Sequence, residues 1–194
     1  MRNGGPILTF FDIDYTLFRT FAMVLVKRGK TVKKRLSSRD YNTYTLKSGE
    51  SYDYTEFRSA EFFRKTSQPI ESVFGKAKRI LSQIHRSPGS RVVVITARSS
   101  FDDHNIFLET FRDVGFDVDN VQFEFAGDLH IQPTAKAKTI AARKHIENSP
   151  FARVRMFDDA VDNLDGFLGL KPLYPHIRFE AHHITPGGRI NAYS

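Results

Sequence analysis

Two carboxylates and a hydroxyl, those of Asp12, Asp14 and Thr16, follow an apolar run near the start of the chain. The run itself, residues 7–11, contains only Ile, Leu, Thr and Phe, which is typical of a short strand buried on both faces of a parallel sheet. In extended backbone, residues two apart point the same way, so the carboxylates of Asp12 and Asp14 would lie side by side and repel each other. A divalent cation between them relieves this repulsion, and Mg²⁺ is commonly held by one or two carboxylates together with substrate phosphate oxygens. The alternative is that Asp-x-Asp merely opens a turn, which is the commoner use of this spacing by itself, and the buried strand before it makes that alternative less favourable.

Further polar side chains follow later strands in the same way. Residues 91–96 predict a second buried strand that ends at Thr96, with Arg98 just beyond it. Another strand is predicted over residues 154–159, and it ends in the paired acids Asp158 and Asp159. Because ligands of doubly wound sheets lie beyond the carboxyl ends of the strands, we expect these side chains to gather near the first strand end.

A helix predicted from Pro133 carries Lys136 and Lys138 in its first turns. Cations are unfavourable at the positive end of a helix dipole, so a lysine placed there suggests pairing with a phosphate or a carboxylate. The pattern leaves both lysines open, and a solvated surface position is the alternative for whichever is not used.

The run Asp12-Ile13-Asp14-Tyr15-Thr16 after an apolar strand resembles motif I of the haloacid dehalogenase-like superfamily. Thr96 and Lys138 resemble motifs II and III, and the pair of acids at residues 158–159 resembles motif IV. The four motifs occur in the required order. The resemblance covers the chain except for the segment between residues 19 and 87.

This resemblance implies a Mg²⁺-dependent phosphohydrolase. Asp12 would be the nucleophile that becomes an aspartyl phosphate, and Asp14 would be the general acid and base. Thr96 and Lys138 would bind the phosphoryl oxygens. Superfamily members that cleave carbon–halogen bonds lack the second Asp, so Asp14 favours phosphoryl transfer. Lys138 is preferred to Lys136 because its surroundings resemble the motif III region of polynucleotide kinase-phosphatases.

The same resemblance implies a set of metal ligands. Mg²⁺ would be held by the carboxylate of Asp12, the main-chain carbonyl of Asp14 and the carboxylate of Asp159. Asp158 would orient the site or bind the metal through water. Substrate binding is assigned to the remaining polar side chains of motifs I and II, Thr16 and Arg98.

Strands that alternate with helices predict an α/β fold with a doubly wound, Rossmann-like parallel sheet. The chain has 194 residues, enough for a single domain over 1–194 with a modest insertion, residues 19–87, that acts as a flap or small cap. Within the insertion we expect a hairpin that turns at Gly29, a loop over residues 46–54, a helix from Thr55 through Phe63 and another after Pro69. The last strand is expected over residues 177–184. By resemblance, the motif I strand should be central.

The composition limits the compartment and the partners. The chain has no Cys, which excludes disulfides and thiolate metal sites, and no stretch reaches membrane-spanning length. The start of the chain lacks the features of a signal peptide, so we expect a cytoplasmic protein without membrane contact. A net charge of +7 and a pI near 9.7 favour polyanionic partners.

The predicted hairpin concentrates this positive charge. No acid occurs between Lys27 and Arg39, and four tyrosines follow within residues 41–54. Cations that contact a phosphate backbone and aromatic rings that stack on bases would together bind single-stranded nucleic acid, with Lys33, Lys34 and Arg35 as contacts. The alternative is a solvated hairpin edge kept basic to prevent strand pairing.

The preferred substrate is therefore a phosphorylated nucleic-acid end. Two alternatives remain: a phosphatase of nucleotides or other small phosphoesters, and a catalytically silent nucleic-acid-binding module on the same fold.

Overall fold

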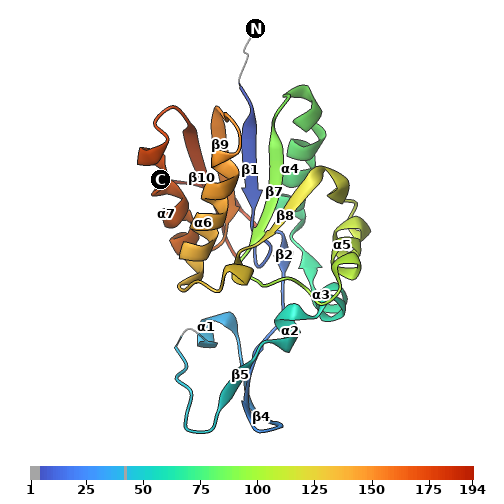
Figure 1. The fold of residues 1–194 in the computed structure, drawn as a ribbon. Coiled ribbons are helices and arrows are strands. Elements are labelled where there is room, and N and C mark those ends of the chain that lie inside the picture. Colours follow the sequence, from blue (N-terminus) through green and yellow to red (C-terminus); the bar gives the residue numbers. More distant parts are fainter. Residues whose placement is uncertain (1–4, 42) are drawn as a thin grey trace.

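A six-stranded sheet forms the centre of the main body, in the order β11-β10-β9-β1-β7-β8 (Figure 1). The computed structural model describes residues 5–41 and 43–194, and it describes residues 38, 39 and 85 by their backbone alone, so the side chain predicted as a hairpin cation at Arg39 lies outside the description. Neighbouring strands are parallel except β11, which is antiparallel to β10. The strands are β1 (Ile7–Phe11), β7 (Arg91–Thr96), β8 (Val121–Phe125), β9 (Arg153–Asp158), β10 (Arg178–Ile184) and β11 (Ile190–Tyr193).

Helices cover both faces of this sheet, which confirms the predicted doubly wound α/β class. The mostly apolar sequence of β1 follows from burial of both faces of the sheet. Of two consecutive residues, Phe10 lies in one buried cluster and Phe11 lies in the other. Phe11 stacks on Phe157 of the neighbouring strand with ring centroids 4.6 Å apart. The cluster that contains Phe11 is closed by α3 (Ala60–Thr66), α4 (Glu71–Ser82) and α5 (His104–Asp113), and the opposite cluster by α6 (Thr134–Glu147) and α7 (Val161–Leu168).

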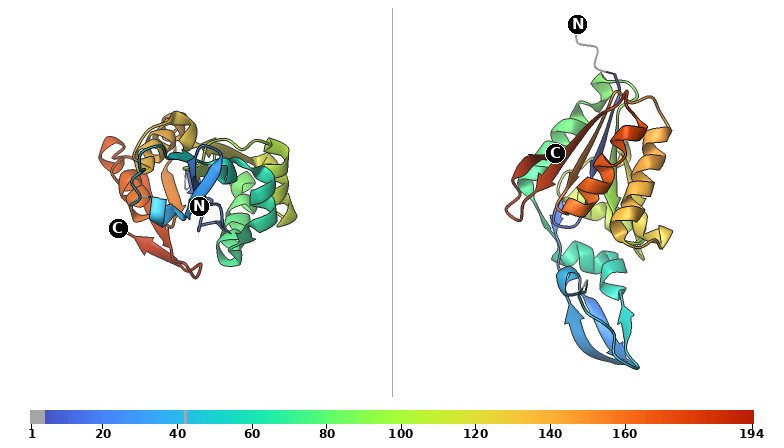
Figure 2. Two further views of the ribbon diagram at one scale, coloured as in Figure 1. Left: turned by 90° about the horizontal axis from the view of Figure 1, so that it is seen from below. Right: turned by 90° about the vertical axis from the view of Figure 1, so that its left-hand side faces the viewer.

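A small three-stranded sheet extends beyond the carboxyl ends of the central strands (Figures 1 and 2). It consists of β3 (Val24–Arg28), β4 (Thr31–Leu36) and β5 (Ser51–Asp53), with α1 (Ser38–Tyr41) and α2 (Thr55–Arg58) beside it. We call residues 24–58 the flap. Its hairpin turns at Gly29, whose φ of 59° favours glycine, as predicted. The small buried cluster of the flap contains Val24, Val26 and Leu36.

The rest of the segment between residues 19 and 87 belongs to the main body, because α3 and α4 pack on the large sheet. The short strands β2 (Phe18–Arg19), before the flap, and β6 (Gln68–Pro69), after α3, pair with each other in antiparallel fashion. Short 3-10 helices occur at Ile84–Arg86, Val118–Asn120, Ala126–Leu129 and Lys171–Leu173. Among the described residues, no helix has the length and apolar character needed to cross a bilayer.

Three local predictions were wrong. The expected loop over residues 46–54 contains β5, which adds to the flap sheet through main-chain pairing with β3. The helix expected from Thr55 is interrupted at Ser59, where the side chain of Ser59 accepts from the N–H of Phe62 and Asp102 accepts from the N–H of Ala60, so a second helix begins there. A further strand, β11, follows the one that was expected to be last.

Candidate active site

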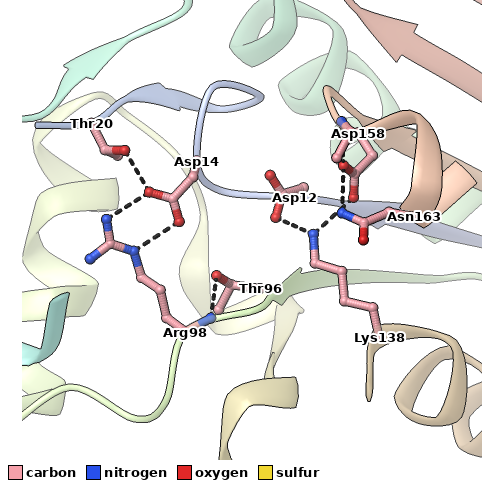
Figure 3. Close-up of polar contacts among 9 residues, drawn as sticks. Asp12, Asp14, Thr20, Thr96, Arg98, Lys138, Asp158 and Asn163 are labelled. Atoms are coloured by element: carbon pink, nitrogen blue, oxygen red, sulfur yellow. Dashed lines mark hydrogen bonds and ion pairs between the residues drawn. The ribbon is translucent and has the colours of Figure 1, made fainter. Parts of the chain in front are cut away.

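Asp12 follows the carboxyl end of β1, between the strands that end at Thr96 and Asp158 (Figure 3). Its N–H donates to the carbonyl of Phe157 at 3.0 Å, which continues the pairing of β1 with β9 by one residue. The residue is only 3% exposed. Position in the middle of the sheet thus gives a buried carboxylate with neighbours on both sides.

Lys138 joins two carboxylates at the centre of the site. Its ammonium donates to Oδ1 of Asp12 at 2.5 Å and to Oδ2 of Asp158 at 2.8 Å. Burial alone would lower the pKa of Lys138, but the negative charges of Asp12 and Asp158 outweigh it and raise that pKa. Lys136, two residues earlier on α6, is exposed. Of the two lysines left open by the sequence, the structure places Lys138 in the site.

Asp158 is fully buried, and its hydrogen-bonding capacity is used by the protein. Its Oδ2 accepts from Lys138, and its Oδ1 accepts from the N–H of Ala160 and from Nδ2 of Asn163, both at 2.9 Å. Asn163 was missed in the sequence, although its place in the first turn of the helix after the paired acids is a usable signal. These three hydrogen bonds fix the carboxylate of Asp158, which in turn fixes the position of the Lys138 ammonium.

Asp159 is partly buried beside Asp158, and its carboxylate completes an acidic cluster. Oxygen atoms of Asp12, Asp158 and Asp159 lie within 4.8 Å of one another. Burial, followed by the negative charge of Asp158, raises the pKa of Asp159 to about 7. Burial also raises the pKa of Asp12, with Asp158 and Asp159 adding to the effect against the opposing charge of Lys138. Burial first, and the neighbouring acids second, thus disfavour the ionised form of both carboxylates.

The charge count and the donor type fit a divalent cation. The fully ionised site has four carboxylates and two cations, which leaves two negative charges; the groups are Asp12, Asp14, Asp158, Asp159, Lys138 and Arg98. Carboxylate oxygens are the ligands that Mg²⁺ prefers. The residues present therefore suit Mg²⁺.

Asp14 lies on the other side of Asp12 and faces Arg98 (Figure 3). Arg98 donates to it in a fork, from Nε to Oδ2 at 2.8 Å and from Nη2 to Oδ1 at 2.6 Å, and Thr20 donates to Oδ1 at 2.5 Å. Burial would raise the pKa of Asp14, but Arg98 and Thr20 outweigh burial and hold that pKa below its ordinary value. The next residue, Tyr15, has a φ of 55°, which turns the chain away directly after the acid.

The arrangement of Arg98 differs from the predicted phosphate contact. Its Nη1 donates to the carbonyl of Phe57 in the flap at 3.0 Å. All three nitrogens of the guanidinium therefore donate to protein groups. Only 3% of its side chain is exposed. Arg98 is better described as a positioning residue for Asp14.

The two predicted threonines are both buried. Oγ1 of Thr96 accepts from the N–H of Arg98 at 3.1 Å, so its hydroxyl proton stays available for a phosphoryl oxygen. Oγ1 of Thr16 is buried and has no hydrogen-bond partner among the described residues. Thr20, which binds Asp14, was not found from the sequence, because the contact depends on the turn after β1.

The predicted nucleic-acid contacts Lys33, Lys34 and Arg35 lie on β4 of the flap and are exposed. Arg35 forms an ion pair with Glu56, and Nζ of Lys34 lies 4.8 Å from the ring centre of Tyr44. Neither Lys33 nor Lys34 has a described ion pair.

The tyrosines of the flap contact one another. Tyr41 packs against Tyr52 with ring centroids 4.9 Å apart, and the hydroxyls of Tyr41 and Tyr54 are 2.9 Å apart. Tyr52 donates to the carbonyl of Tyr44 at 2.7 Å. Much of this aromatic surface is thus used inside the flap, although Tyr54 remains 42% exposed.

Comparison with known proteins adds little at the sequence level: no protein-family model and no curated protein matches the chain. Among solved structures, the chain is similar to the HAD domain of effector protein Lem4 from Legionella pneumophila. The identity is 15% and the TM-score is 0.48, over 95% of this chain and 88% of that one. A likeness this distant carries no statement about activity, so we infer function from the side chains of this chain.

Proposed function

We propose that the chain is a Mg²⁺-dependent phosphohydrolase of the haloacid dehalogenase-like type, which works through an aspartyl phosphate on Asp12. The observation that carries this proposal is the placement of Asp12. It is a buried carboxylate at the end of the central strand, held by the Lys138 ammonium, next to a cluster of acids with two uncompensated negative charges. A carboxylate so placed is suited to attack phosphorus, because the covalent intermediate divides one difficult hydrolysis into two easier steps.

In the first step, a carboxylate oxygen of Asp12 forms a bond to phosphorus while the bond to the leaving oxygen breaks. The leaving oxygen takes a proton from Asp14. In the second step, water attacks phosphorus, Asp14 accepts a proton from that water, and the bond to Asp12 breaks to release phosphate. Lys138 and the hydroxyl of Thr96 bind the nonbridging oxygens as their charge grows.

The residues that would hold Mg²⁺ are Asp12, the main-chain carbonyl of Asp14, and Asp159, with Asp158 orienting the group through its bonds to Lys138, Ala160 and Asn163. When bound, Mg²⁺ neutralises the phosphate so that the anionic nucleophile can approach it. Without the metal, Lys138 alone would only partly compensate the repulsion between the Asp12 carboxylate and the phosphate.

Proton donation by Asp14 requires a change in its contact with Arg98. A carboxyl whose pKa lies below its ordinary value is ionised near neutral pH and has no proton to give. Asp14 therefore acts as an acid when the Arg98 fork loosens, and it acts as a base without such a change.

For the substrate we propose a phosphorylated nucleic-acid end. The support is the position of the flap beyond the same strand ends as Asp12, together with the exposed cations on β4. The second candidate, a small phosphoester, is favoured by the packing of the flap tyrosines against one another, which leaves less aromatic surface for bases.

The decisive experiment is the Asp12→Asn variant. It should reduce hydrolysis of p-nitrophenyl phosphate to background while the circular dichroism spectrum stays native, because the amide cannot attack phosphorus. Acid quenching of the wild-type reaction should trap phosphate on the peptide that contains Asp12. Turnover by Asp12→Asn at the wild-type rate would contradict the proposal, and a wild-type protein that turns over no phosphoester with Mg²⁺ would favour the silent binding module.

A further inference from the structure

A groove lined by cations lies at the opposite end of the central strands from Asp12. We call it the basic groove. It has a volume of about 680 Å³ and is bordered by α4, by the first residues of β1, β7 and β9, and by the segment between α4 and β7. No acid occurs among its described lining residues, whereas six cations do: Lys76, Arg79, Arg86, Arg91, Arg153 and Arg155.

Few of these charges are balanced by the protein. Glu180 lies 3.7 Å from Nε of Arg153, but the same carboxylate also pairs with Arg178 at 2.8 Å. Among the described residues, Arg79 donates to a carbonyl of its own helix, that of Gly75, and to no carboxylate, and Arg91 lies over the ring of Phe151. Several half-buried cations therefore share one hollow whose described lining contains no carboxylate, and the carboxylate of Glu180 beside Arg153 is shared with Arg178.

Arg155 shows this imbalance most clearly. Its Nη2 donates to the hydroxyl of Thr9 at 3.0 Å, and its Nε is buried without a hydrogen-bond acceptor among the described residues. Burial lowers the pKa of Arg155, and Arg153 adds to this effect against the opposing charge of Glu180. A buried Nε–H without an acceptor, on a partly buried guanidinium, is unfavourable unless an anion or another acceptor satisfies it.

We propose that the basic groove binds a small anion that carries several phosphate groups, such as the polyphosphate chain of a nucleotide. Arginine forks match phosphate oxygens geometrically, and the cations come from three segments around one hollow rather than along a line. A volume of about 680 Å³ is within the range of small-molecule sites. This site is separate from Asp12 and does not depend on the hydrolytic activity.

The test measures binding of sodium tripolyphosphate by isothermal titration calorimetry, with EDTA present. The Asp12→Asn variant is used so that the probe is not consumed, and wild type serves as a second background. The groove variant replaces Lys76, Arg86 and Arg91 by Gln. A matched control replaces Lys65, Lys144 and Lys171 by Gln, which removes the same charge from exposed positions that do not border the groove.

We expect one saturable site, a rise in melting temperature with the probe, and at least a tenfold loss of affinity in the groove variant but not in the control. No saturable binding to the parent protein, or an equal loss in both variants, would overturn the proposal. If the triple groove variant does not fold, the single variants Lys76→Gln and Arg86→Gln are compared in the same way. An unphosphorylated ten-residue oligothymidylate that binds the groove tenfold more tightly than tripolyphosphate would overturn the assignment to a small molecule.

Discussion

Two carboxylates of the candidate site have opposite electrostatic surroundings. Burial tends to raise the pKa of both Asp14 and Asp159. For Asp14 the fork from Arg98 outweighs burial, whereas for Asp159 the adjacent Asp158 adds to it and the pKa reaches about 7. Separation of pKa values between neighbouring acids is how one site divides roles between them. Near neutral pH Asp14 is ionised, while Asp159 takes up and loses a proton, which the proposed Mg²⁺ would have to displace.

This difference predicts a pH-dependent response to Mg²⁺. Asp159 must lose its proton to coordinate the metal, so the rise in melting temperature caused by Mg²⁺ should be larger at pH 8 than at pH 6. In the metal-free protein, a higher pH has the opposite effect on stability. The contribution of protonated Asp159 to stability is complete below the ordinary pKa of 3.8 and is lost as the pH rises through about 7. Differential scanning fluorimetry at both pH values, with and without Mg²⁺, measures both effects. Asp159→Asn should remove most of the pH dependence, and equal Mg²⁺ responses at pH 6 and pH 8 would contradict the assignment.

At the scale of elements, Arg98 joins the flap to the site. It follows β7, binds Asp14 after β1, and donates to Phe57 in α2. Its guanidinium carbon lies 4.8 Å from the ring centre of Phe57 and 5.4 Å from that of Phe63. Movement of α2 would therefore be transmitted to the carboxylate of Asp14.

Replacing Arg98 should impair catalysis more than substrate binding. Arg98→Gln removes the fork and the contact with α2, so we expect kcat to fall by about 10- to 100-fold with a small change in KM. Arg98→Lys should recover little, because a point charge does not reproduce a fork. Steady-state kinetics on p-nitrophenyl phosphate measures this, with Arg112→Gln as an exposed control. An unchanged kcat in Arg98→Gln would show that Asp14 is positioned without it.

A glycine pair tests how the loop after β10 is fixed to α4. Gly188 has a φ of 78°, and a Cβ there would lie 2.7 Å from side-chain atoms of Ile70 and Ser72, whereas a Cβ at Gly29 meets nothing within 4 Å. Gly188→Ala should lower the free energy of unfolding by about 2 kcal/mol or more. Gly29→Ala should lower the free energy of unfolding by only about 1 kcal/mol, the cost of a left-handed backbone conformation for alanine. Urea denaturation compares them, and equal losses would mean that the loop moves aside.

The sequence predicted the elements that carry local patterns and missed those that depend on distant partners. Residues 92–95 are all β-branched and apolar, and Gly29 readily adopts the positive φ that its turn needs, so both elements were predicted correctly. The strand β5 is short and polar, and it exists because it pairs with β3. Likewise, the fork between Arg98 and Asp14 joins residues from two strand ends, and no local pattern encodes such a contact.

At the scale of the whole molecule, two separate regions gather positive charge. One group of cations lies on the flap, beyond the carboxyl ends of the strands, and another lines the basic groove near their amino ends. The regions are separated by the length of the central strands. Their contributions to anion binding can therefore be measured independently.

The flap cations predict a salt dependence that differs between substrates. Activity on a phosphorylated oligonucleotide should fall steeply with added salt through counterion release, while activity on p-nitrophenyl phosphate should change little. Replacing Lys33, Lys34 and Arg35 together by Gln should raise KM for the oligonucleotide and flatten its salt slope, and kcat for the small substrate should stay near wild type. Kinetics at several salt concentrations measures this, with Lys65→Gln/Lys144→Gln as the control. Unchanged oligonucleotide kinetics would support the small-phosphoester candidate, and equal losses on both substrates would mean that the flap shapes the site.

The central place of β1 also affects how the protein is made. This strand leaves the ribosome before both of its neighbours, because β7 and β9 begin only at Arg91 and Arg153. A nascent chain that ends before β9 carries Asp12 on a strand that lacks a partner on at least one edge, and it also lacks Asp158 and Asp159. Pairing over such sequence separation is slow, and an unpaired apolar strand is prone to aggregation. The candidate site therefore cannot assemble before β9 has been made, because Asp12 needs β7 and β9 on its two sides.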